Sequence, residues 1–137
     1  MREVLFRGKR AVNGNWAEGY YSKGFLFPEE ETLRDFIYVF SEESGKWEFD
    51  YAMVDPETVS QYTGLCDKNG KKIFEGDILP IWENGEEYNY KVFYNADCFM
   101  LAMLDSAQGS YPLSIKHNQT EVIGNIYDNP EMLGGRS

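Results

Sequence analysis

Short runs rich in aromatic and β-branched residues recur along the chain, and turn residues separate them. Side chains of these types fit a pleated, half-buried surface, so the runs predict β-strands. None of them has the apolar period of a long helix. In the first half, strands are predicted at residues 4–9, 15–21, 36–40 and 47–54, with turns at Asn13-Gly14 and Ser44-Gly45. The first half is therefore expected to form an antiparallel meander.

The second half contains more turn signals at shorter spacing. Asp67-Lys68-Asn69-Gly70 is expected to close a hairpin between residues 61–65 and 72–74, and Asn84-Gly85 is expected to close another. Further strands are predicted at residues 78–82, 88–94, 98–104, 111–115 and 121–127. Short strands at regular spacing with tight turns are typical of a small β-barrel.

Asp55-Pro56 marks the expected boundary between the two halves. An Asp can accept amide hydrogen bonds at the start of a helix, and Pro suits the first helical position, so one helical turn is predicted here. The predicted organisation is an N-terminal antiparallel β lobe over residues 1–54 and a β-barrel lobe over residues 55–131, packed together as one unit. Residues 132–137 are expected to form a disordered tail.

The charge balance narrows the classes of partner. The 137 residues include 13 basic and 23 acidic side chains, and the net charge of −10 disfavours binding to nucleic acid and to anionic membranes. No run is long and apolar enough to cross a membrane, and the N-terminus does not resemble a signal peptide. The two cysteines, Cys66 and Cys98, form no pairing motif. We therefore expect a cytoplasmic protein in a reducing compartment.

Candidates for catalysis or metal binding are few. Glu75 and Asp77 are two residues apart and would share a strand face, where paired carboxylates can divide acid and base roles. Gly76 between them indicates a bend instead, at which an Asp commonly accepts amide hydrogen bonds. His117 is the only histidine and has no Cys or His near it in sequence, so no metal set or nucleophile–base pair is recognisable. We expect a protein that is not an enzyme and that needs no cofactor.

A basic cluster near the N-terminus is a candidate binding surface. Arg7 and Lys9 share one face of the first predicted strand, and Trp16, Tyr20 and Tyr21 lie on the strand expected to pair with it. Aromatic and basic platforms of this kind bind single-stranded nucleic acid. The alternative is a solvated strand face whose charges balance the acidic remainder, and the net charge favours this alternative.

Four segments together resemble the YopX family of phage and prophage proteins. They are residues 2–10 with 13–16 and Gly19, residues 54–59, residues 61–78 (QYTGLCDKNGKKIFEGDI) and residues 121–131 (EVIGNIYDNPE). The resemblance implies a mainly β fold with an SH3-like barrel in the C-terminal half, and a homo-oligomer encoded by a phage or an integrated element. It implies no catalytic residue.

The residues of these segments have structural explanations. Turns or bends explain the glycines, because glycine tolerates backbone angles that other residues avoid. Packing explains the tyrosine of the last segment. The residues concerned are Gly64, Gly70, Gly76, Gly124 and Tyr127.

The expected function is that of a non-enzymatic, oligomeric interaction module that contacts copies of itself and an unidentified protein. The excess of aromatic residues supports it, because Tyr, Trp and Phe are favoured in interface cores. Two alternatives remain open. Acidic runs such as Glu29–Glu31 and Glu86-Glu87 could imitate a DNA backbone and so inhibit a host nucleic-acid enzyme. The face of Arg7 and Trp16 could instead bind single strands weakly.

Overall fold

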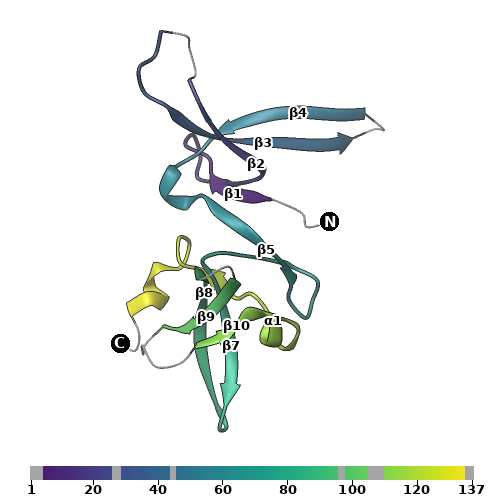
Figure 1. Ribbon diagram of the computed structural model, residues 1–137, viewed down its shortest axis with the longest axis vertical. Helices are drawn as coiled ribbons and strands as arrows, with labels where there is room; N and C mark the ends of the chain where they lie inside the picture. The colour runs from purple at the N-terminus through teal and green to yellow at the C-terminus, as the bar shows by residue number, and fades with distance from the viewer. Residues whose placement is uncertain (1–4, 26–28, 44–45, 96–97, 105–109, 135–137) are drawn as a thin grey trace. The chain divides into compact units, whose positions relative to one another are not determined.

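A computed structural model describes residues 5–25, 29–43, 46–95, 98–104 and 110–134 (Figure 1). The chain divides into two compact units, an N-terminal unit over Met1–Gln61 and a C-terminal unit over Tyr62–Ser137. The division falls later than the boundary predicted after Val54. The reason is that Val54 bridges to Arg10, and Ser60 and Gln61 still pair with the first strand.

The N-terminal unit is built on one antiparallel sheet with the strand order β4-β3-β2-β1-β5. Its strands are β1 (Phe6–Lys9), β2 (Trp16–Gly24), β3 (Arg34–Glu43), β4 (Lys46–Met53) and the first residues of β5 (Ser60–Cys66). The predicted order of strands in the meander is therefore confirmed, and the turn predicted at Ser44-Gly45 lies outside the described residues. The predicted helical turn is also present as η1 (Pro56–Thr58), where Oδ1 of Asp55 accepts a hydrogen bond from the amide of Glu57 at 3.0 Å.

Alternation along the strands gives the N-terminal sheet two different faces. Ala17, Ile37 and Val54 form a small buried cluster on one face. Side chains packed against this cluster include those of Phe6, Tyr21, Val39, Ala52 and Val59. Because successive strand residues point to opposite sides, the sequence neighbours of these core-facing residues in β1, β2 and β3 project from the other face of the sheet.

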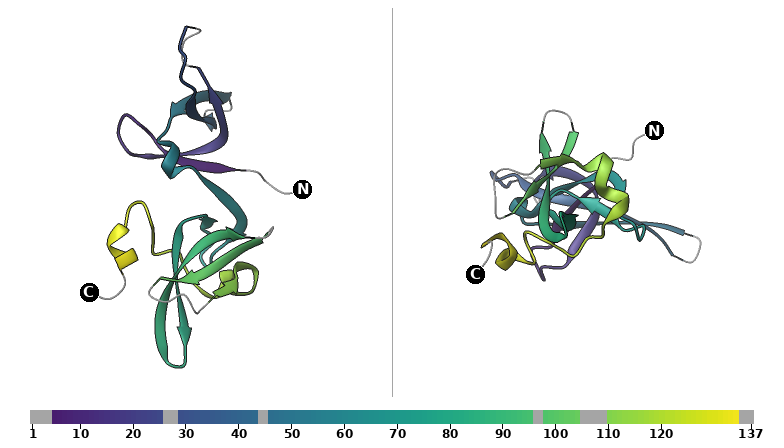
Figure 2. Two further views of the ribbon diagram at one scale, coloured as in Figure 1. Left: turned by 60° about the vertical axis from the view of Figure 1, so that its left-hand side comes forward. Right: turned by 90° about the horizontal axis from the view of Figure 1, so that it is seen from below.

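The C-terminal unit contains a second antiparallel sheet with the strand order β10-β9-β8-β7-β11. Its strands are β7 (Asp77–Glu83), β8 (Glu86–Asn95), β9 (Cys98–Met103), β10 (Ser110–Pro112) and β11 (Gly124–Asn125). In the same unit, the remainder of β5 pairs with β6 (Lys72–Phe74). The long hairpin of β7 and β8 extends beyond the rest of this unit (Figures 1 and 2).

The main core of the C-terminal unit lies on one side of this sheet. It consists of the buried residues Ile73, Leu79, Ile81, Tyr90, Val92, Phe99, Leu101 and Leu113. The predicted hairpin turn at Asn84-Gly85 is confirmed, since both residues have positive φ angles of 52° and 81°. Asp67 to Gly70 likewise close the predicted hairpin between β5 and β6.

Several predictions for the C-terminal unit need correction. Neither sheet closes into a barrel within the described residues, because the outer strands β10 and β11 do not pair with each other, so the SH3-like barrel is not confirmed. The strand predicted at 111–115 ends at Pro112 and continues as helix α1 (Leu113–Lys116), followed by η2 (His117–Gln119). Proline lacks the amide hydrogen that a continuing strand would use.

The last part of the chain also differs from its prediction. The strand predicted at 121–127 is reduced to the two residues of β11. The start of the predicted disordered tail lies within η3 (Pro130–Gly134), while residues 135–137 are outside the described part of the chain. No helix among the described residues is long and apolar enough to span a membrane.

Candidate functional site

The structure brings together Arg7, Lys9 and Trp16, three of the five residues of the predicted aromatic and basic platform, in the N-terminal unit. Lys9 of β1 lies directly opposite Trp16 of β2. The guanidinium carbon of Arg7 is 4.5 Å from the centre of the Trp16 ring, and Nζ of Lys9 is 5.5 Å from a ring centre of the same residue. Both distances fit cation–π attraction, which fixes the indole against two positive charges.

Arg7 and Lys9 differ in burial and therefore in what they can contact. Arg7 is only 8% exposed, and it lies between Glu18 on β2 and Ser60 on β5 in the register of the sheet. Its planar guanidinium therefore packs under the indole and positions it. Lys9 is half-buried and remains within reach of a ligand at the surface.

A row of tyrosines continues the surface beside Trp16. Tyr20 of β2 pairs with Tyr38 of β3, and Tyr38 pairs with Tyr51 of β4. Tyr20 is 56% exposed, Tyr51 is 53% exposed and Tyr38 is half-buried. The ring of Phe36 meets that of Tyr51 edge-on, with 5.7 Å between the ring centres. Phe36 itself is buried, and we call the surface formed by Trp16, Tyr20, Tyr38 and Tyr51 the aromatic face.

Tyr21 does not belong to this face, contrary to the prediction. It packs against the buried cluster on the opposite side of the sheet, because neighbouring residues of a strand alternate. Its hydroxyl donates a hydrogen bond to Oδ2 of Asp35. Burial, together with this hydrogen bond and the negative charge of Asp35, raises the pKa of Tyr21 to about 12.

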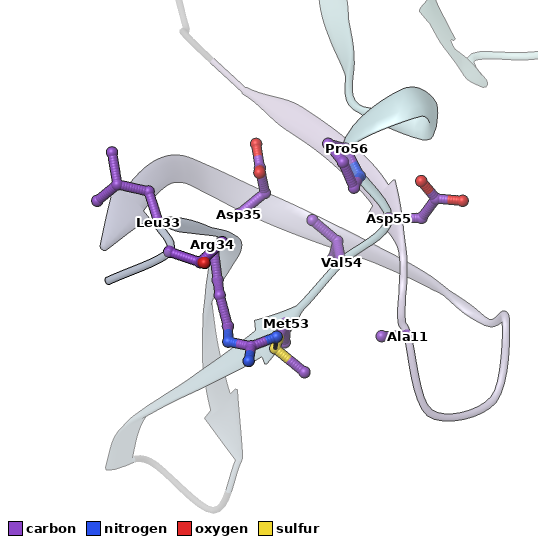
Figure 3. A pocket seen from close by; sticks show the side chains of 9 residues that line it. Ala11, Leu33, Arg34, Asp35, Met53, Val54, Asp55 and Pro56 are labelled. Atoms are coloured by element: carbon purple, nitrogen blue, oxygen red, sulfur yellow. Dashed lines mark hydrogen bonds between the residues drawn. The ribbon is translucent and has the colours of Figure 1, made fainter. Parts of the chain in front are cut away.

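A pocket of about 450 Å³ opens near the start of β3 (Figure 3). Its lining combines both charges with apolar side chains, among them Arg34, Asp35, Met53, Val54 and Asp55. These charged groups already have local partners: Nε of Arg34 donates to Glu30, Asp35 accepts from Tyr21, and Asp55 caps η1. The pocket therefore shows no convergent set of polar groups that would orient a small ligand.

The two carboxylates considered for catalysis have different surroundings. Asp77 is fully buried, and its Oδ2 accepts a hydrogen bond from the amide of Phe74 at 2.8 Å. Glu75 is half-buried, and the intervening Gly76 has a φ of +87°. The bend at Gly76 is held by its amide donating to the carbonyl of Val92 and by its carbonyl accepting from the amide of Ile126. These hydrogen bonds fix the backbone conformation where β7 begins.

Tyr127 and the remaining candidate glycines also have structural surroundings. A Cβ added at Gly76 would lie 3.2 Å from the Tyr127 ring, and one added at Gly124 would overlap the Asn129 side chain. Gly64 and Gly70 have positive φ angles of +85° and +83° in open space, so their backbone conformation is what favours glycine.

Sequence reasoning missed the role of Asp67 in the most distinctive segment of the chain. Its Oδ1 accepts hydrogen bonds from the amides of Asn69 and Lys71, and its Oδ2 accepts one from the amide of Val122, all at 2.9 Å. Burial raises the pKa of the Asp67 carboxyl, but these bonds and the charge of Lys71 outweigh it, so that the pKa is lowered. An Asp at the start of a turn indicates a side chain that accepts amide hydrogen bonds within that turn. The bond to the amide of Val122 has no such local signal in the sequence.

A second polar cluster missed from the sequence lies in the C-terminal unit. The buried hydroxyl of Tyr90 donates to Oε1 of Glu83 at 2.6 Å, and Nζ of Lys116 is 4.9 Å from the Tyr111 ring centre. Burial and the bond to Glu83 raise the pKa of Tyr90, whereas hydrogen bonds from Tyr111 and Tyr90 lower the pKa of Glu83. The phenols therefore stay protonated and the carboxylate stays ionised near neutral pH, as in a structural cluster.

Trp82 was also missed as a surface residue. It lies on β7 opposite Glu87 and is 68% exposed, while its neighbour Ile81 is buried in the core. Among the described residues, no group of three or more His, Cys, Asp and Glu side chains is placed to hold a metal ion. Cys66 and Cys98 form no disulfide.

These observations define a two-unit, antiparallel β protein whose distinctive polar residues stabilise turns. The sequence profile of the YopX protein family matches residues 6–134, and the chain belongs to this family. The chain is also similar to a solved structure, "Crystal structure of protein EF1440 from Enterococcus faecalis", with 26% sequence identity and a TM-score of 0.55. That similarity covers 97% of this chain and 99% of the other. A comparison with curated proteins finds no match.

Proposed function

We propose that this protein is a non-enzymatic interaction module that assembles with copies of itself and presents surfaces to a protein partner. The exposed Trp82 supports this proposal most directly. At 68% exposure, the indole leaves apolar surface in water whose burial would contribute on the order of 3 kcal/mol. Tryptophan is enriched among the residues that dominate binding energy at protein interfaces.

The surroundings of Trp82 fit such a contact. It lies two residues before the tight turn of the β7–β8 hairpin, which extends from the unit, and its cross-strand neighbour is the charged Glu87. An aromatic anchor beside polar residues is the usual arrangement at an interface centre, where a polar rim keeps water out. The family resemblance further leads us to propose an accessory role in a phage or an integrated element, which the genes beside this one would test.

Sedimentation velocity over a series of protein concentrations tests the assembly. We expect the unmodified protein to form an oligomer and Trp82→Ala to dissociate at least tenfold more readily, because the lost burial exceeds 1.4 kcal/mol. Val12→Ala is the matched control, since Val12 is 85% exposed in the turn after β1 of the other unit. An unmodified protein that stays monomeric at every concentration refutes self-assembly. An oligomer that Trp82→Ala leaves intact refutes the role of Trp82.

A further inference from the structure

We propose that the aromatic face of the N-terminal unit binds single-stranded nucleic acid. This goes beyond the assembly proposed above and uses a surface of the other unit, so the two proposals can fail separately. Its basis is the combination of three tyrosines in cross-strand register with positive side chains at both ends of the same face.

The tyrosine row supplies the stacking surface. Tyr20, Tyr38 and Tyr51 occupy paired positions on three adjacent strands, which places them about 5 Å apart from strand to strand. The two outer members, Tyr20 and Tyr51, each expose more than half of their surface. Every nucleobase has an apolar ring face, so a platform of aromatic side chains accepts successive bases with little dependence on sequence.

Positive charges flank this platform. Lys9 and Trp16 form one end of the face, and Arg34, paired with Gly24, forms the other. The eight steps from Trp16 to Gly24 along β2 span about 26 Å, which accommodates several nucleotides of an extended single strand. The side chain of Arg34 is 42% exposed, and its Nε is bonded to Glu30, so its positive end is already oriented at the surface.

The local charge differs from that of the whole molecule. Among the described side chains, this side of the sheet presents Lys9 and Arg34 against Glu18 on β2 and Glu30 beside Arg34, while Arg7 is only 8% exposed. The chain as a whole has a net charge of −10. A phosphate backbone therefore meets two accessible cations on a surface of balanced charge here, and net negative charge elsewhere. Because few cations are accessible, stacking is expected to contribute more than phosphate contacts. The affinity should accordingly fall with salt by a shallow slope of about −0.7 to −1.4.

Fluorescence anisotropy with a labelled oligothymidylate of about ten nucleotides tests the proposal on the 137-residue chain. We expect the single strand to bind and a duplex of the same length to bind much less, because its bases are already stacked on one another. Tyr20→Leu should weaken binding by about tenfold, whereas Tyr20→Phe should retain it, because only the first change removes the ring. Lys9→Gln should reduce the salt slope by about 0.7.

Matched variants keep this test decisive. Tyr51→Leu and Tyr51→Phe form a second pair on β4 if the first pair lowers thermal stability. Ile115→Ala, at a residue that is 54% exposed in the other unit, should leave oligonucleotide binding unchanged. Absence of binding by the unmodified protein overturns the proposal. Equal binding by the Leu and Phe variants at both positions also overturns it. A third outcome would also overturn the proposal: the unmodified protein does not bind the oligonucleotide, and Tyr20→Leu loses self-association. This outcome would assign the aromatic face to contact with a second copy of the chain.

Discussion

The hydroxyl of Tyr21 donates a hydrogen bond to Oδ2 of Asp35, which lies diagonally across the pairing of β2 with β3. Asp35 is 9% exposed, so the bond supplies a donor to a carboxylate that has little access to water. Since successive strand residues alternate, anchoring Tyr21 on the core side places Tyr20 on the aromatic face. The pair thus links the packing of the N-terminal unit to the orientation of its candidate binding surface.

Replacing Tyr21 by Phe is expected to lower the free energy of unfolding by about 1 to 3 kcal/mol, because the buried carboxylate loses its phenol donor. Urea denaturation at neutral pH measures this change. Tyr20→Phe on the exposed side of the same strand is the control and should alter stability by much less. Equal effects of the two substitutions would contradict the role assigned to the Tyr21 hydroxyl.

The same pair predicts a dependence on alkaline pH. The pKa of Tyr21 rises from an ordinary value of 10.0 to about 12 in the folded protein, so the folded state holds this proton more tightly than the unfolded state. The resulting stability is complete below pH 10 and is lost as the pH rises through 12. The difference in unfolding free energy between the unmodified protein and Tyr21→Phe should therefore shrink above pH 10, and a constant difference would exclude this linkage.

Asp67→Asn is expected to destabilise the C-terminal unit by about 2 to 3 kcal/mol, because an amide cannot replace both oxygens that accept from Asn69, Lys71 and Val122. The lowered pKa of Asp67 gives the sign of the pH effect: its contribution is present above pH 3.8 and is lost as the pH falls through the folded value. Acid unfolding followed by circular dichroism measures both effects. Asp55→Asn, which affects one cap bond at an exposed residue, is the control and should cost less.

Gly76→Ala is expected to lower stability more than Gly64→Ala, although both glycines have φ angles near +85°. A side chain in this backbone region costs about 1 to 2 kcal/mol at either position. At Gly76 the new Cβ would also lie 3.2 Å from the Tyr127 ring, whereas at Gly64 it would meet nothing within 4 Å. Thermal unfolding of the two variants measures the difference, and identical melting temperatures would show that the contact with Tyr127 is not restrictive.

The turns of this fold were largely predictable because each depends on a few adjacent residues. Asn84-Gly85 tolerates two positive φ angles, and Asp55-Pro56 supplies both a cap and a fixed φ. The helix at Leu113 was missed because the apolar run that includes it is equally compatible with a strand, and packing in the core decides between them. Of the glycines interpreted as turn or bend residues, Gly64, Gly70 and Gly76 have positive φ angles, whereas Gly124 lies in β11 and is restricted by the Asn129 side chain.

The sequence by itself determined the mainly β character, the hairpin turns and the membership of Arg7, Lys9 and Trp16 in one surface, because alternation and turn chemistry are local properties. Only the tertiary structure decided which tyrosines join that surface, since this depends on the register in which β2, β3 and β4 pair. It also decided that Asp67 binds the amide of Val122, which lies 55 residues further along the chain. Contacts between distant segments follow from how strands pack, and no short pattern of residues encodes them.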